Sequence, residues 1–306
     1  MGLKRLAASP GPSGRPRPAI PKAPYRLAVY IIGVFIALFL GVATTVKAES
    51  ALEPGPDETV SLKILTLNIH SGVNWFGQYD LESIARYIEE VQPDIVGLQE
   101  VARGWSSQSR FEDIPGDLAR RLKMDFAYSA SLERNNGNFG NLILSRYPIV
   151  GIFTELMPGN LERRSFGFVQ IMVGGVRINF LTTHLGLSES DRQEQVTAIW
   201  NFISQVDGPL VITGDFNGSD GDVAVKAFHG SFLDVQELSG FRDRGTFRVK
   251  NGSLIPRMDF IFASPEFMVS NFWIDENYIS DHLPLVAELK LTVSNQDVAG
   301  QPVMYQ

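Results

Sequence analysis

Several short apolar runs in this chain end in a polar side chain, and this pattern limits the possible folds more than any other feature. Leu62–Leu67 is followed by Asn68, and the run in the sequence GLQE ends at Glu100. In α/β proteins, strand ends that meet at one edge of a sheet are where functional sites are built. The polar residues that follow or interrupt such runs are Asn68, Glu100, His184, Asp215, Asn217, Asp259, Asp281 and His282.

Helical patterns separate some of these strand-like runs. Apolar residues repeat at helical spacing over 81–88, after the candidate N-cap Asp80, and over 196–203, after the candidate N-cap Ser188. Gly174-Gly175 separates two strand-like runs and predicts a hairpin turn. Hairpins mixed with single helices predict α/β layers around a mixed sheet.

The first sixty residues predict a membrane-associated leader ahead of one folded domain. Residues 1–26 are basic and rich in proline and glycine, which is typical of a disordered arm. Residues 27–46 carry no charge, and about 20 such residues are enough to cross a bilayer as a helix. We expect residues 47–60 to form a linker, 61–293 the folded domain and 294–306 a flexible tail.

The apolar segment has two interpretations. Its length favours an uncleaved transmembrane anchor over a signal peptide, but the small residues Val46 and Ala48 also suit cleavage after Ala48. In both cases the basic arm stays in the cytoplasm by the positive-inside rule. We therefore expect an extracytoplasmic domain that is either held by a single membrane span or secreted.

Cysteine content and charge exclude or disfavour several functions. The chain has no cysteine, which excludes disulfides, zinc–thiolate sites and cysteine nucleophiles. Residues 1–48 hold seven of the 27 basic residues and none of the 34 acidic ones, so residues 49–306 carry 20 basic and 34 acidic residues. Because nucleic-acid affinity depends on Lys and Arg contacts to phosphates, so acidic a domain makes nucleic acid a less favoured partner.

Each polar residue also has a structural explanation when taken alone. Asn68 or Asp215 could lie in a turn, and His184 could be a hydrogen-bonded core histidine. Asp259 is harder to explain, because a carboxylate between Met258 and Phe260 is costly to bury unless it is paired. As a set, the residues supply oxygen ligands for Mg²⁺ or Mn²⁺, a histidine base and donors for phosphoryl oxygens.

Seven motifs combine these residues and occur in a fixed order over residues 62–284. They are LKILTLNIHSG, PDIVGLQE, GNLILSRYPI, TTHL, GDFN, RMDFIF and SDHLP. Together they resemble the endonuclease/exonuclease/phosphatase superfamily, which includes DNase I, exonuclease III-type enzymes, bacterial sphingomyelinases and inositol polyphosphate 5-phosphatases. The resemblance implies a four-layer α/β sandwich (DNase I-like), in which two mixed β-sheets pack face to face with helices outside.

The resemblance also implies a metal site and a base. Glu100 looks like the principal metal ligand, with Asn68 beside it to help hold metal or phosphate. His282 resembles the general base that activates water, and Asp259 would orient its imidazole. Asp281 would then lie close to the metal and the nucleophile.

Other residues are implied in phosphate binding. Asp215 and Asn217 resemble the pair that contacts the scissile phosphate, and His184 looks like the second histidine of the DNase I and sphingomyelinase branches. The chain departs from exonuclease III-type repair enzymes, which carry an acidic residue where His70 stands and lack the histidine that His184 supplies. Both departures disfavour abasic-site repair.

Arg146 and Arg164 are further candidates for phosphate binding, because a guanidinium binds phosphate oxygens with two hydrogen bonds. Asn141 is a similar candidate. A solvated surface position explains the two arginines equally well. The sequence thus predicts a membrane-tethered or exported Mg²⁺-dependent phosphoesterase for a lipid-linked or small phosphate ester. An exported DNase I-like endonuclease is the alternative, and a non-catalytic binding protein on the same fold is a minor one.

Overall fold

The computed structural model describes residues 59–134 and 136–292. The predicted arm 1–26, the apolar segment 27–46, linker residues 47–58 and residues 293–306 lie outside the described residues. Two compact units divide the chain, and every described residue belongs to the unit Ala48–Gln306. Within this described part, no helix has the length and apolarity needed to cross a membrane.

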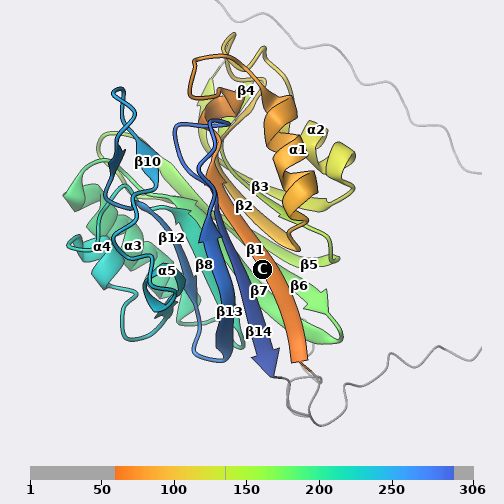
Figure 1. Ribbon diagram of the computed structural model, residues 1–306, viewed down its shortest axis with the longest axis vertical. Helices are drawn as coiled ribbons and strands as arrows, with labels where there is room; N and C mark the ends of the chain where they lie inside the picture. The colour runs from red at the N-terminus through yellow and green to blue at the C-terminus, as the bar shows by residue number, and fades with distance from the viewer. Residues whose placement is uncertain (1–58, 135, 293–306) are drawn as a thin grey trace, which may run out of the picture. The chain divides into compact units, whose positions relative to one another are not determined.

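Two six-stranded sheets form the centre of the described unit (Figure 1). The first sheet has the order β13 (Phe267–Ile274), β14 (Leu285–Thr292), β1 (Thr59–Asn68), β2 (Ile95–Arg103), β4 (Gly137–Ser145) and β3 (Asp125–Arg134). The second has the order β5 (Ile149–Met157), β6 (Arg164–Val173), β7 (Val176–His184), β8 (Leu210–Asp215), β12 (Asp259–Ala263) and β9 (Leu233–Asp234). A separate two-stranded ribbon pairs β10 (Phe247–Arg248) with β11 (Leu254–Ile255).

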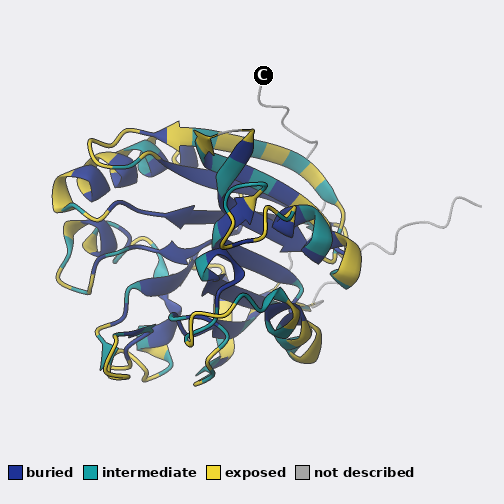
Figure 2. Cartoon of the chain, turned by 90° about the horizontal axis from the view of Figure 1, so that it is seen from above, coloured by how far each residue is buried: buried dark blue, intermediate teal, exposed yellow. Residues whose placement is uncertain are grey.

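Helices cover the outer faces of both sheets. The helical elements are η1 (His70–Gly72), α1 (Leu81–Val91), α2 (Ile114–Leu122), α3 (Glu189–Ile203), α4 (Val223–Lys226) and α5 (Val235–Leu238). Helices α1 and α2 pack with the outward-facing residues of β1, β2 and β4, and α3 and α4 pack with those of β6, β7, β8 and β12. A third apolar cluster lies between the sheets. Figure 2 shows this burial as dark blue strands with exposed residues outside, so the four-layer α/β sandwich is confirmed for the described residues.

The two longest helices begin at the predicted caps. The side chain of Asp80 accepts a hydrogen bond from the backbone N–H of Ser83, and Ser188 accepts one from Asp191. A polar side chain at this position satisfies a backbone donor that the helix itself leaves free. These caps fix where α1 and α3 leave the loops that follow β1 and β7.

Strand direction brings the ends of four strands to one edge. Strand β1 runs parallel to β2, and β7 runs parallel to β8, so the carboxyl ends of both pairs lie at the same edge of their sheets. Strands β12 and β14 run antiparallel to β8 and β1 and begin at this edge. The residues at the ends of β1, β2, β7 and β8 and at the beginnings of β12 and β14 therefore meet.

Between the sheets, a polar layer lies next to this edge. The side chain of Gln99 donates hydrogen bonds to Thr66 on β1, 3.1 Å away, and to Thr182 on β7, 2.9 Å away. Thr213 on β8 donates to Thr182 at 3.1 Å. All four side chains are buried, and their hydrogen bonds join one sheet to the other.

Most expected strands and helices are present, and the structure has others that were not predicted. Strand β1 begins at Thr59, two residues before the predicted domain start at Ser61. Helix α2 and strands β3 and β5 were not predicted from the sequence. Strand β5 alternates half-buried and exposed residues, and its exposed positions include Val150, Ile152 and Leu156, so the usual apolar–polar contrast is missing.

The substitution Gly97→Ala tests how tightly the sheets meet. The new Cβ would lie 2.5 Å from Oγ1 of Thr213 and 2.7 Å from Oγ1 of Thr182, so the sheets must move apart or lose hydrogen bonds. We expect the free energy of unfolding to fall by about 1–3 kcal/mol, measured by urea unfolding with tryptophan fluorescence. Gly221→Ala is the matched control, since nothing lies within 4 Å of a Cβ there. Equal losses in the two variants would contradict this close contact.

Candidate active site

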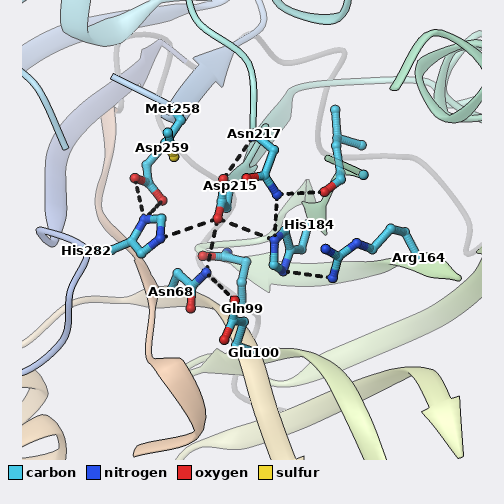
Figure 3. A network of polar contacts seen from close by, with 12 residues as sticks. Asn68, Gln99, Glu100, Arg164, His184, Asp215, Asn217, Met258, Asp259 and His282 are labelled. Carbon is cyan, nitrogen blue, oxygen red and sulfur yellow. Dashed lines mark hydrogen bonds and ion pairs between the residues drawn. The ribbon is translucent and has the colours of Figure 1, made fainter. Parts of the chain in front are cut away.

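The carboxylate of Asp215, at the end of β8, lies at the centre of the polar cluster (Figure 3). Its Oδ2 accepts a hydrogen bond from Nδ2 of Asn68 at 3.0 Å and lies 3.4 Å from Nε2 of His184 and 3.6 Å from Nε2 of His282. Its Oδ1 accepts from the backbone N–H of Asn217 at 2.9 Å. Burial raises the pKa of Asp215, and the charge of His282 opposes that rise.

His282 lies in a hydrogen-bonded chain that orients its ring. Its Nδ1 lies 2.9 Å from Oδ2 of Asp259, and the same oxygen accepts a hydrogen bond of 2.6 Å from the hydroxyl of Thr246. The ring of Phe247 packs against the imidazole, with centroids 4.8 Å apart. Because Asp259 holds Nδ1, the other ring nitrogen, Nε2, faces the centre of the cluster. The carboxylate within the apolar strand β12 is therefore paired, as its sequence context required.

The surrounding carboxylates change the titration of this ring. Burial by itself lowers the pKa of His282, but the nearby carboxylates of Asp259 and Asp215 outweigh it and raise that pKa to about 10. The two carboxylates thus favour the protonated ring. His282 must lose this proton before it can accept one from water.

His184, at the end of β7, has the opposite character. Burial, then the charges of Arg164 and His282, hold the pKa of His184 well below its usual value, so the ring is neutral. Its Nδ1 lies 3.4 Å from Nη1 of Arg164, and its Nε2 lies 2.9 Å from Nδ2 of Asn217. The two histidines lie on either side of Asp215 in Figure 3 and differ in charge.

A bulge in β2 gives Glu100 its direction. Val96 and Leu98 face the helices, so strict alternation would point residue 100 the same way. Instead the pairing with β4 shifts between Leu98 and Val101, and Glu100 adopts a left-handed φ of 56°. Its Oε1 accepts a hydrogen bond of 3.1 Å from Nδ2 of Asn68. Such a conformation is uncommon for a residue other than glycine and clusters at functional sites.

The donor set beside Asn68 fits a hard divalent cation. One amide nitrogen of Asn68 donates to the carboxylates of both Glu100 and Asp215, and Oε2 of Glu100 has no partner among the described residues. Carboxylate and amide oxygens are the ligands that Mg²⁺ prefers. Asp215, Asp259 and His282 also offer ligand atoms within 4.8 Å of one another. However, His282 and Thr246 already occupy the oxygens of Asp259.

Asp281 lies at the rim of the cluster. Its Oδ2 is 3.6 Å from Nδ1 of His70, and its Oδ1 lies 3.2 Å from the hydroxyl of Ser280. That hydroxyl also donates a hydrogen bond of 2.7 Å to the backbone carbonyl of Asn68. Asp281 is thus close to the Asn68 side of the cluster.

The three weaker candidates have different positions. Arg164 is buried against His184, and Nδ2 of Asn141 donates to the carbonyl of Ser165 at 2.8 Å, next to Arg164. The prediction for Arg146 was wrong. It follows Ser145, which pairs with Ile95 at the opposite end of β2, about 16 Å of strand from Glu100. Because β4 runs antiparallel to β2, its carboxyl end points away from the cluster.

Two hydroxyl residues of the site were missed in the sequence. Thr246 holds Asp259, and Ser280 holds the backbone of Asn68. Thr246 lies in a stretch without periodicity, so no sequence signal could have selected it. Ser280 is part of the SDHLP motif, and its place directly before Asp281 and His282 was the available signal.

Comparison with known proteins agrees with this geometry. A model of the Endonuclease/Exonuclease/phosphatase family matches residues 65–282, which include all the residues of the cluster. The chain belongs to the endonuclease/exonuclease/phosphatase family. This family is metal-dependent, and its members are typically phosphoesterase hydrolases. The chain is also 31% identical over 265 residues to the uncharacterized protein YbhP of Escherichia coli (strain K12), covering 77% of this chain and all of that protein.

Solved structures share the fold of this family member. An endonuclease/exonuclease/phosphatase from Beutenbergia cavernae has a TM-score of 0.65 and 26% identity, and the match covers 76% of this chain and 72% of that one. A mannosyl-6-phosphatase from Bacteroides thetaiotaomicron has a TM-score of 0.59 and 18% identity, with 74% and 99% covered. A humanized D. rerio TDP2 has a TM-score of 0.60 and 20% identity, with 75% and 98% covered.

The titration of His282 can be tested without turnover. Replacing Asp259 by Asn removes the nearest negative charge, and this removal favours the neutral ring of His282. We therefore expect the pKa of His282 to fall from about 10 toward or below neutrality. Imidazole ¹⁵N chemical shifts measured against pH in EDTA report this change. Asp281→Asn is the control and should lower the pKa less, because Asp281 contributes least of the three carboxylates. A larger fall in the control would contradict the assigned pair.

Proposed function

We propose that this protein is a membrane-tethered, Mg²⁺-dependent phosphoesterase that hydrolyses a phosphodiester or phosphomonoester by in-line attack of water. One observation carries the proposal: His282 is paired with Asp259 through Nδ1 while its Nε2 faces the buried carboxylate of Asp215. Once the ring has lost its Nε2 proton, this nitrogen can take a proton from water at the point where the phosphate-binding groups converge.

In the proposed reaction, His282 accepts the proton of the attacking water at Nε2. The water oxygen bonds to phosphorus, and the bond from phosphorus to the ester oxygen breaks. Asp259 stabilises the imidazolium that forms. In-line displacement needs the leaving oxygen on the side opposite the water. The neutral ring of His184, on the other side of Asp215, lies where it can bind that oxygen, which takes its proton from solvent.

Phosphoryl oxygens gain negative charge during this reaction. Asn217 and the guanidinium of Arg164 lie next to His184 and would bind those oxygens. A Mg²⁺ ion held by Glu100, with Asn68 beside it, would neutralise further charge on them. Mn²⁺ has the same ligand preference and is the alternative metal.

Charge and the N-terminal sequence support the choice of substrate and location. The excess of acidic residues over 49–306 disfavours a polyanionic substrate, and the uncharged residues 27–46 have the length of a bilayer span. We therefore propose a lipid-linked or small phosphate ester as substrate and an extracytoplasmic position for the catalytic domain. Cleavage after Ala48 would release the same domain as a secreted enzyme.

A hydrolysis panel on the full chain in detergent tests this function. The substrates are p-nitrophenyl phosphate, bis-p-nitrophenyl phosphate, a phospholipid, a lipid diphosphate and plasmid DNA, each with Mg²⁺ and with EDTA. We expect Mg²⁺-dependent turnover that falls about 10²–10⁴-fold in His282→Ala, because the general base is lost. His229→Ala is the matched control and should keep activity, since His229 pairs with Asp234 outside the cluster.

The panel has outcomes that would reject parts of the proposal. Turnover that persists in His282→Ala would contradict its role as base. Plasmid DNA as the preferred substrate would replace the lipid-ester proposal with the endonuclease alternative. A folded protein that hydrolyses no substrate while binding Mg²⁺ would favour a binding protein.

The two arginines provide a paired test of phosphate binding. Arg164→Ala should lower kcat/KM about 10- to 100-fold, because a charge-assisted hydrogen bond to the phosphate is lost. Arg146→Ala should leave kcat/KM within about twofold, because Arg146 lies at the other end of the sheet. Steady-state kinetics on the best substrate of the panel measures both. Equal losses would contradict the placement of these residues.

A further inference from the structure

Arg248, on the ribbon strand β10, is a buried arginine without a carboxylate partner. Only 7% of its surface is exposed. The other buried arginines of the described residues are Arg164, Arg192 and Arg257, and each forms an ion pair with an aspartate or glutamate. Among residues 59–134 and 136–292, no carboxylate forms an ion pair with Arg248. A guanidinium removed from water in this way is costly unless an anion accompanies it.

The hydrogen bonds of this guanidinium are mostly unfilled. Its Nη2 donates to the carbonyl of Asn277 at 3.2 Å, and its Nε is buried with no partner. The guanidinium carries five N–H donors in all. The guanidinium makes cation–π contacts with two aromatic rings. Its central carbon lies 4.6 Å from the ring centre of Tyr278 and 5.9 Å from that of Trp75.

An exposed aromatic pair lies beside the same group. The rings of Phe76 and Tyr278 contact each other with centroids 5.4 Å apart, and they are 67% and 50% exposed. The backbone N–H of Trp75 donates to the carbonyl of Tyr278 at 3.0 Å, which joins the loop after η1 to the loop before Asp281. An unpaired cation and an apolar surface are thus adjacent.

The backbone of Arg248 borders the polar cluster around Asp215. Phe247 pairs with His282 across an antiparallel bridge, and the N–H of Arg248 donates to the carbonyl of Asp281 at 2.8 Å. Asp281 in turn contacts His70, whose backbone N–H donates to the side chain of Asn68. Arg248 therefore lies beyond the Asn68 side of the site, away from His184.

We propose that Arg248 binds a second anionic group of the substrate, beyond the scissile phosphate, and that Phe76 and Tyr278 contact the apolar part that carries it. The ligand class is a diphosphate ester of an apolar alcohol. This inference rests on the proposed phosphoesterase function, which places the scissile phosphate at His282. The missing carboxylate partner of Arg248 is then supplied by the substrate.

Calorimetry on the full chain in detergent tests the proposal. The protein carries His282→Ala to prevent turnover, and the ligands are geranyl diphosphate and geranyl monophosphate with Mg²⁺ present. We expect the diphosphate to bind about 10- to 100-fold more tightly than the monophosphate. In Arg248→Met the two ligands should bind with about equal affinity, because one charge-assisted contact to the diphosphate is lost. Arg244→Met is the matched control and should keep the ratio, since Arg244 is half-exposed and pairs with Glu276.

Each outcome supports or overturns the proposal. A ratio that survives Arg248→Met in a folded protein overturns it, as does an equal loss in Arg244→Met. If Arg248→Met does not fold, Phe76→Ala decides, because its exposed side chain contributes little to stability. Phe76→Ala should weaken the binding of geranyl diphosphate several-fold and leave the binding of inorganic pyrophosphate unchanged. Equal effects on the binding of both ligands overturn the proposal. Since binding is measured, absent turnover in the unmodified chain counts against the proposed function alone.

Discussion

One carboxylate oxygen, Oδ2 of Asp215, holds the cluster together. It meets an amide from the first sheet and two imidazoles, one from β7 and one from the loop before β14. A buried carboxylate is stable only when such partners offset the loss of water. The positions of Asn68, His184 and His282 thus depend on the carboxylate of Asp215. Burial raises the pKa of this carboxyl, and its charge in turn helps to raise the pKa of His282.

The site is assembled across the contact between two sheets rather than within one. Asn68 and Glu100 belong to the first sheet, whereas His184, Asp215 and Asp259 belong to the second. The hydrogen bonds of Gln99 to Thr66 and Thr182 fix the sheets at this depth, where apolar side chains would allow them to slide. The geometry of the polar cluster therefore depends on how the two sheets pack, and the apolar cluster between the sheets stabilises this packing.

The sequence was informative where chemistry and local pattern coincide. Strand ends carrying Asn68, His184 and Asp215 were predicted, because apolar runs that stop at a polar residue mark a sheet edge. Glu100 was predicted to follow a strand and instead lies within β2. The bulge that turns Glu100 inward was not predicted, since its left-handed φ arises from pairing between β2 and β4. Arg146 was wrongly assigned to the site, because a residue that follows a strand can lie at either edge of the sheet. The direction of the strand determines which edge it is, and β4 runs antiparallel to β2. Thr246 needed tertiary contacts to be recognised.

Among the described residues, β1 is the first strand and its neighbour β14 is the last. Thr66 on β1 pairs with Leu285, so this ladder joins residues that are far apart in the chain. Such long-range pairing forms late in folding and only after nearly the whole domain has been synthesised. His282 stands three residues before Leu285 and is brought to Asp215 by the same docking step. Closure of the first sheet and the arrival of His282 beside Asp215 are therefore one event, and a nascent or truncated domain without β14 lacks the ladder that positions His282.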